Sequence, residues 1–173
     1  MVDIDGVVSL FSAPGAAPGG APGRARQSAG AEPVEGSFHT IDGILHFLSS
    51  TAAAHLLSLA RFFDLVWASG WEEKADEYLP RLLGLPRQLP FLHFARGGGA
   101  GASTRAHWKL DAIERYAGAR ALAWIDDAFN AECHAWAQTR AAPTLLVSTS
   151  PERGLSSGEA ELLLSWAQRL AEA

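Results

Sequence analysis

The sequence predicts an α/β fold of three layers, in which a parallel sheet of about five strands carries helices on both faces. Apolar runs of strand length alternate with segments of helical periodicity about five times along the chain, a pattern typical of parallel sheets. The run over residues 63–68 is largely apolar, as expected of a central strand that is covered on both faces. A chain of 173 residues also has the length of one domain, and we assign residues 1–173 to a single domain.

The N-terminal third contains a short first strand and an unusual insertion. Residues 13–36 are rich in Pro, Gly and Ala and lack apolar periodicity, which predicts a flexible segment. Because this segment follows the first strand and carries Arg24 and Arg26, it could instead be a lid that meets an anionic substrate. Two apolar runs around an Asp-Gly pair predict a hairpin within 38–48, and a helix follows over 51–61.

The rest of the chain alternates strands and helices. Acidic residues in the first turn and a Gly at the end support a helix over residues 71–83. Ser156-x-x-Glu159 forms a capping box at the start of the last helix. Strands are expected over residues 63–68, 89–95, 121–125 and 144–148, and helices over 71–83, 107–117, 130–140 and from 156 onwards.

Composition excludes several classes of function. The net charge of −5 argues against nonspecific attraction to nucleic acid or to anionic membranes. No uncharged apolar stretch reaches membrane-spanning length. The single cysteine, Cys133, permits no internal disulfide and is expected to be a packing residue on a helix. We therefore expect a cytoplasmic protein with no membrane association and no obligate protein partner.

Polar residues follow the predicted strands at the points where ligands bind in parallel sheets. Since the carboxyl ends of parallel strands meet at one edge, these residues should converge although they are far apart in sequence. Carboxylates suit Mg²⁺, while a hydroxyl and a lysine suit phosphate oxygens. The pattern therefore predicts a phosphate and magnesium site formed by Asp3, Asp5, Ser69, Lys109, Asp126 and Asp127.

The order of these residues resembles the haloacid dehalogenase-like hydrolase superfamily. Its four motifs are matched in order by Asp3-Ile4-Asp5-Gly6-Val7, by Val66-Trp67-Ala68-Ser69-Gly70, by Lys109 and by Ile125-Asp126-Asp127. More narrowly, residues 65–72 and 122–127 are similar to the small domains of this superfamily associated with Swiss Army Knife RNA-repair proteins. The resemblance implies a Rossmann-like three-layer fold and a Mg²⁺-dependent phosphoric monoester hydrolase.

The resemblance also implies a role for each residue. Asp3 would be the nucleophile that forms an aspartyl-phosphate, and Asp5 would protonate the leaving group and then activate water. Ser69 and Gly70 would bind phosphate oxygens, with Lys109 screening the charge of Asp3. The metal ligands would be Asp3, Asp5, Asp126 and Asp127. The substrate would be a phosphorylated small molecule, such as a nucleotide, or the phosphorylated end of a nucleic acid.

Three alternatives are open from the residues. A phosphoacceptor signalling module uses similar groups, but there both acidic positions precede the lysine. A nucleotide-cofactor site could use Gly97-x-Gly99-x-x-Ala102, with Glu114 as the acidic residue, although this leaves Asp3 and Asp5 unexplained. A binding module without catalytic activity is the third alternative.

Aromatic residues near the predicted site have two interpretations. Trp67, Trp124 and Trp166 are expected in the core. Trp71 and Trp108 lie just past a strand end and at a helix start, where either could stack on a base or a sugar, although packing is favoured. His107, two residues before Lys109, could also meet the substrate.

Overall fold

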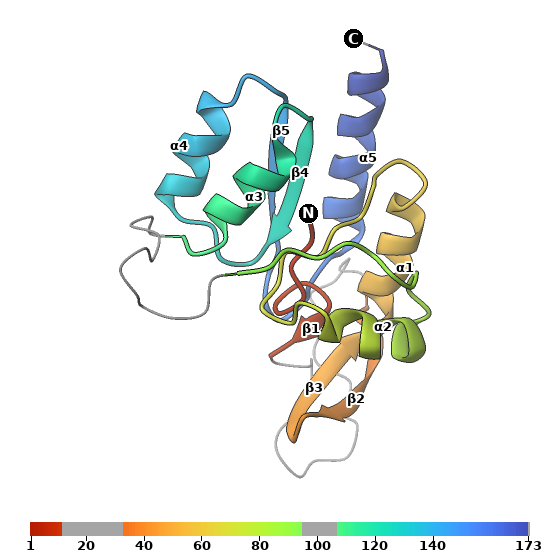
Figure 1. The fold of residues 1–173 in the computed structure, drawn as a ribbon. Helices are drawn as coiled ribbons and strands as arrows, with labels where there is room; N and C mark the ends of the chain where they lie inside the picture. Colours follow the sequence, from red (N-terminus) through yellow and green to blue (C-terminus); the bar gives the residue numbers. More distant parts are fainter. Residues whose placement is uncertain (12–32, 95–106, 173) are drawn as a thin grey trace, which may run out of the picture.

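The structure is a computed structural model, and it describes residues 1–11, 33–94 and 107–172 (Figure 1). Five helices and five strands form in these residues. The elements are, in order, β1 (Ser9–Leu10), β2 (Gly36–Ile41), β3 (Ile44–Ser49), α1 (Ser50–Leu59), α2 (Lys74–Leu83), α3 (Leu110–Ala117), β4 (Leu122–Asp126), α4 (Ala131–Thr139), β5 (Thr144–Ser148) and α5 (Ser157–Ala171). The glycine run with Gly97 and Gly99 and nearly all of the predicted insertion, residues 13–32, lie outside these ranges.

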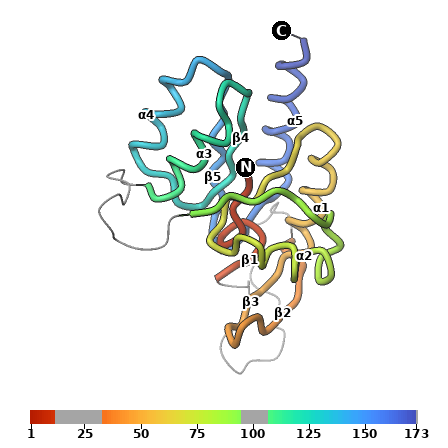
Figure 2. Tube along the Cα trace, viewed as in Figure 1, coloured from red at the N-terminus to blue at the C-terminus, as the bar shows by residue number. Residues whose placement is uncertain are grey.

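Parallel pairing links five segments of the chain, but only two of them are regular strands. β4 and β5 pair in parallel along their whole length. Single parallel bridges join Val2 to Trp67 and to Ile125, and Trp67 to Phe91, and Figure 2 shows the N-terminal segment beside β4. The α/β class is confirmed, whereas the five regular strands are not. Pro90 contributes to the short pairing, because it lacks the N–H that a longer ladder would need.

Helices cover both sides of this parallel arrangement. Along β4, Ala123 and Ile125 belong to a core cluster with residues of α1 and α5, whereas Leu122 and Trp124 belong to a second cluster with residues of α3 and α4. Figure 1 shows these two pairs of helices on opposite sides of β4 and β5. The alternation follows from the two-residue period of a strand, and it produces the three layers that the sequence predicts.

A second, antiparallel sheet follows the first strand-like segment. Its order is β1-β3-β2, and the β2–β3 hairpin confirms the prediction for residues 38–48. Asp42 and Gly43 at its turn have φ values of 51° and 80°, which suits the turn types that join two-residue hairpins. The pairing of β1 with β3 attaches this sheet to the chain just after Asp5. We had not expected a third strand, because Ser9 and Leu10 are too few to give a pattern.

The predicted helices occur with small shifts at their ends. α2 begins at Lys74 rather than at residue 71, because Glu72 has a φ of 46°, outside the right-handed helical region. α3 begins at Leu110, three residues later than expected. The capping box of Ser156 and Glu159 is present at the start of α5. No helix among the described residues is both long and apolar enough to span a membrane.

The core confirms most of the expectations for single residues. Trp67 and Trp124 are buried, as is the free thiol of Cys133 in α4. Trp166 is only partly buried, and its ring stacks on Phe63 with 6.2 Å between ring centroids. Burial raises the pKa of the Cys133 thiol, which agrees with a packing role rather than a nucleophilic one.

Candidate active site

Backbone pairing brings the two acidic motifs to one edge of the parallel arrangement. Asp3 follows the bridge at Val2, and its backbone N–H donates to the carbonyl oxygen of Ile125 at 3.0 Å. Asp126 is therefore next to Asp3 although 122 residues separate them. On the other side, the N–H of Ala68 donates to the carbonyl oxygen of Val2 at 2.8 Å, so that Ser69 ends the neighbouring segment.

Lys109 joins the two carboxylates. Its Nζ lies 2.6 Å from Oδ2 of Asp3 and 2.7 Å from Oδ2 of Asp126. The three residues are only 3, 6 and 0% exposed in the order Lys109, Asp3, Asp126. A buried ammonium is costly unless it is paired, so these two contacts account for its position just before α3. The predicted approach of Lys109 to the first aspartate is thus present.

Further donors fix the orientation of both carboxylates. Oδ1 of Asp3 accepts the N–H of Ile4 at 2.8 Å. Asp126 accepts the indole N–H of Trp124 on Oδ2 and the N–H of Ala128 on Oδ1, each at 3.1 Å. With their orientation fixed in this way, the groups need little rearrangement when charge develops nearby.

The negative charge of the cluster exceeds its positive charge. Burial, opposed by Lys109 and assisted by the neighbouring Asp126, raises the pKa of Asp3 to about 6. Burial and the neighbouring Asp126 also raise the pKa of Asp127. One lysine cannot neutralise three carboxylates, so the site favours a bound cation.

Three of the four predicted metal ligands lie together. Oxygen atoms of Asp3, Asp126 and Asp127 fall within 4.8 Å of one another, and carboxylate oxygens are the donors that Mg²⁺ prefers. Gly6 makes room for this group, because a Cβ at its position would lie 2.3 Å from Oδ2 of Asp127. Its φ of 71° also favours glycine. The donor set therefore fits Mg²⁺.

Asp5, the fourth predicted ligand, stands outside this group of three. Its Oδ2 accepts the indole N–H of Trp71 at 3.1 Å. The side chains of Asp3 and Asp5 thus have different partners, lysine for the first and tryptophan for the second. This difference suits a division of chemical roles between them better than a shared role as ligands.

The hydroxyl of Ser69 is the unsatisfied group of this edge. Its Oγ is buried and has no hydrogen-bond partner among the described residues, which costs roughly 1–3 kcal/mol. Gly70 follows, and among the described residues a Cβ there would meet only Trp108, at 3.8 Å. A phosphate oxygen would satisfy the Ser69 hydroxyl at a point where the backbone leaves space.

The two other aromatic candidates differ in exposure. His107 is buried with its ring edge-to-face against Trp124, and burial lowers its pKa, so it packs as a neutral ring. Trp108 is 53% exposed and its ring centroid lies 5.2 Å from Nζ of Lys109. Phe94 contacts the same ring edge-to-face at 4.5 Å.

Two residues near the site escaped the sequence reasoning. Trp124 belongs to the site as well as to the core, because its position two residues before Asp126 places both side chains on one face of β4. Thr149 donates its hydroxyl to the carbonyl oxygen of Gly6 at 2.9 Å, and its N–H donates to that of Asp126 at 3.1 Å. Its place just after β5 was the available signal.

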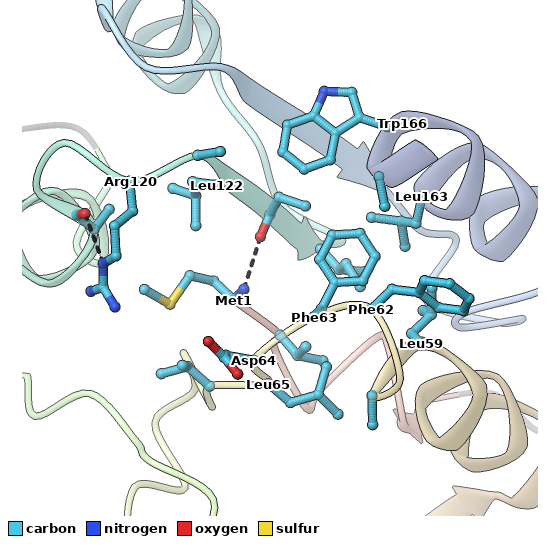
Figure 3. A pocket seen from close by; sticks show the side chains of 18 of the residues that line it. Met1, Leu59, Phe62, Phe63, Asp64, Leu65, Arg120, Leu122, Leu163 and Trp166 are labelled. Carbon is cyan, nitrogen blue, oxygen red and sulfur yellow. Dashed lines mark hydrogen bonds between the residues drawn. The ribbon is translucent and has the colours of Figure 1, made fainter. Parts of the chain in front are cut away.

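A cavity of about 930 Å³ lies at the opposite edge of the parallel arrangement, away from the carboxylates. Its lining includes Met1, Phe63, Leu163 and Trp166, together with Leu122 at the start of β4 (Figure 3). Asp126, at the other end of β4, does not line it. Size alone therefore does not identify the site, and the polar groups described above do.

Comparison with known proteins agrees with this geometry. No curated protein and no solved structure matches the chain. The family model described as the HAD domain in Swiss Army Knife RNA repair proteins matches residues 1–160. With nearly the whole chain matched, and with Asp3, Lys109 and Asp126 in contact as the four motifs require, the chain belongs to this family of haloacid dehalogenase-like (HAD) domains.

Proposed function

We propose that the domain is a Mg²⁺-dependent phosphatase that hydrolyses phosphoric monoesters through an aspartyl-phosphate on Asp3. The observation that carries the proposal is the buried ammonium of Lys109 between Asp3 and Asp126. A phosphate dianion that approaches a carboxylate is repelled, and a fixed cation in a buried site lowers that repulsion by several kcal/mol. Membership of the HAD family supports hydrolase chemistry of this kind.

Two displacements at phosphorus make up the reaction. In the first, a carboxylate oxygen of Asp3 forms a bond to phosphorus while the bond from phosphorus to the leaving oxygen breaks. Asp5, in its acid form, gives its proton to that oxygen. In the second, water attacks the phosphorus of the aspartyl-phosphate, Asp5 takes a proton from the water, and the bond to Asp3 breaks to release inorganic phosphate.

The surrounding residues hold the phosphoryl group during both displacements. The Ser69 hydroxyl, which has no partner in the part of the chain that the structure describes, donates to one of its oxygens, next to the open backbone of Gly70. Asp3, Asp126 and Asp127 would hold Mg²⁺, which when bound supplies positive charge opposite the phosphate. Asp5 as a further ligand stays a prediction.

The experiment measures phosphate release from p-nitrophenyl phosphate by the purified chain. Activity that depends on Mg²⁺ and is silenced by EDTA is expected. Asp3→Asn should remove turnover while leaving the fold intact, because the amide keeps the shape and loses the nucleophile. Asp42→Asn is the matched control, since Asp42 lies on the turn of the β2–β3 hairpin and pairs there with Lys74 of α2. Wild-type rates in folded Asp3→Asn would refute the role of Asp3. A stable phosphorylated Asp3 would indicate a phosphoacceptor.

We further propose that the substrate carries a base, as in a nucleotide or a nucleic-acid end. Trp108 supports this, because its exposed ring adjoins Lys109 and is held by Phe94. Stacking of one base on an aromatic side chain contributes about 1–3 kcal/mol. The family description, which refers to RNA repair proteins, points in the same direction.

The substrate proposal is tested by comparing a nucleoside monophosphate with glycerol phosphate. Trp108→Ala should lower kcat/KM for the nucleotide roughly 5- to 150-fold, the equivalent of one stacked base, and change the value for glycerol phosphate little. Trp108→Phe keeps a ring and should retain most of the preference. An equal loss with both substrates in Trp108→Ala would contradict stacking.

A further inference from the structure

We infer that Trp71 is a positioning residue that fixes the carboxyl group of Asp5 for proton transfer. The inference rests on the proposed function and adds a residue that the four motifs do not include. Its basis is the hydrogen bond from the Trp71 indole N–H to Oδ2 of Asp5 at 3.1 Å, which joins residues 66 positions apart.

The indole is itself held from the other side. The ring of His46 packs edge-to-face on Trp71 with 5.0 Å between centroids. His46 Nδ1 lies 2.9 Å from the hydroxyl of Ser9. Ser9 is four residues after Asp5, and the two positions form a backbone bridge. The contacts therefore form a closed circuit from Asp5 through Trp71, His46 and Ser9, which restricts movement of the indole.

A tryptophan N–H can only donate a hydrogen bond. It therefore requires a lone pair on Oδ2 of Asp5, and in the acid form of a carboxyl group the carbonyl oxygen is the better acceptor. The transferable proton is thereby directed to Oδ1, the oxygen that Trp71 does not contact. A serine or histidine could donate or accept and would select neither oxygen.

The indole and the phosphate-binding hydroxyl come from the same turn. Trp71 is two residues after Ser69, and the N–H of Glu72 donates to the carbonyl oxygen of Ser69 at 3.1 Å. A phosphoryl group bound at Ser69 and the proton on Asp5 are thus positioned by one short segment. The segment from Ser69 to Trp71 therefore fixes the position of the leaving oxygen relative to the carboxyl group of Asp5.

The dependence of rate on the leaving group tests this inference. p-Nitrophenolate leaves without a proton, whereas the alkoxide of glycerol phosphate needs one. Trp71→Phe keeps an aromatic ring at this position and removes the N–H donor together with part of the indole. We compare kcat/KM, which covers only the steps up to departure of the leaving group. We expect kcat/KM for glycerol phosphate to fall at least about tenfold more than kcat/KM for p-nitrophenyl phosphate, a part of the range that general acid catalysis provides. Trp166→Phe, which changes a tryptophan of the remote cavity, should leave the ratio of the two rates unchanged.

A double-mutant cycle shows whether Trp71 acts through Asp5. In an Asp5→Asn background, Trp71→Phe should have no further effect on glycerol phosphate hydrolysis, since the acid is already absent. Multiplicative losses in the double variant, or an equal loss of kcat/KM for both esters in Trp71→Phe alone, would overturn the inference. So would a wild-type ratio in Trp71→Phe.

The inference and the proposed function fail in different ways. A wild-type protein that hydrolyses neither of these esters nor a nucleoside monophosphate refutes the proposed function. An active wild type with an unchanged leaving-group ratio in Trp71→Phe refutes the inference alone. If Trp71→Phe does not fold, the indole N–H resonance of Trp71 is compared between wild type and Asp5→Ala. A shift toward the position of a solvated indole is expected, and an unchanged resonance would overturn the contact.

Discussion

Replacing Asp3 by asparagine should stabilise the metal-free protein at neutral pH. Burial raises the pKa of Asp3 from 3.8 to about 6, so the folded state binds a proton that the unfolded state has lost between these two pH values. The free energy of unfolding therefore falls as pH rises from about 4 to about 6 and stays lower above that range. The full difference is about 3 kcal/mol, at about 1.4 kcal/mol for each pH unit that separates the two values.

Asparagine avoids this cost because it is neutral at every pH. The pKa of about 6 already includes the ion pair with Lys109, so the gain reaches about 3 kcal/mol only where the amide packs as well as the protonated carboxyl group. For a chain of this length we expect Tm to rise by roughly 3–10 °C at pH 7.5 in EDTA. At pH 4.5, which lies above the unfolded pKa of 3.8 but well below the folded pKa of about 6, only about 1 kcal/mol of the difference between the two proteins should remain.

Calorimetry of both proteins at pH 4.5, 6.0 and 7.5 makes the measurement. Asp42→Asn is a control of opposite sign. Contact with Lys74 lowers the pKa of Asp42, so this group stabilises the fold above its unfolded pKa and the effect is lost as pH falls. Asp42→Asn should therefore lower Tm or leave it unchanged at pH 7.5. A difference between wild type and Asp3→Asn that is the same at all three pH values would refute the reasoning.

The remaining predictions concern metal and catalysis. Asp126→Ala should raise the Mg²⁺ concentration needed for half-maximal activity strongly, as measured by metal titration of phosphate release; an unchanged requirement would contradict the ligand assignment. Gly6→Ala should displace Asp127 and cost about 1–3 kcal/mol through its positive φ and close contact. In denaturant titrations Gly43→Ala is its matched control, since φ is also positive there but no described residue lies within 4 Å of the added Cβ. Asp5→Asn should still give a burst of p-nitrophenolate but release phosphate about 10²- to 10⁴-fold more slowly; wild-type release in stopped-flow assays would count against it.

Local patterns in the sequence predicted most of the regular elements. The turn at Asp42-Gly43, the capping box at Ser156 and the strand over residues 144–148 all depend on neighbours within a few residues. The extent of pairing between the parallel segments around Trp67 and Phe91 could not be predicted from the sequence, because an apolar run does not reveal how many backbone hydrogen bonds the adjacent segment can form. Pro90 interrupts that pairing, and only the register of the neighbouring segment makes its missing N–H matter.

The candidate site divides in the same way. The motif order in the sequence was sufficient to predict Asp3, Lys109 and Asp126 as one group, since parallel strand ends must converge. Tertiary structure alone decided that Asp5 faces Trp71 instead of the three-carboxylate group, that Trp124 donates to Asp126, and that Gly6 makes room for Asp127. The contacts that link separate segments depend on how those segments pack in three dimensions, and spacing along the chain carries no record of that packing.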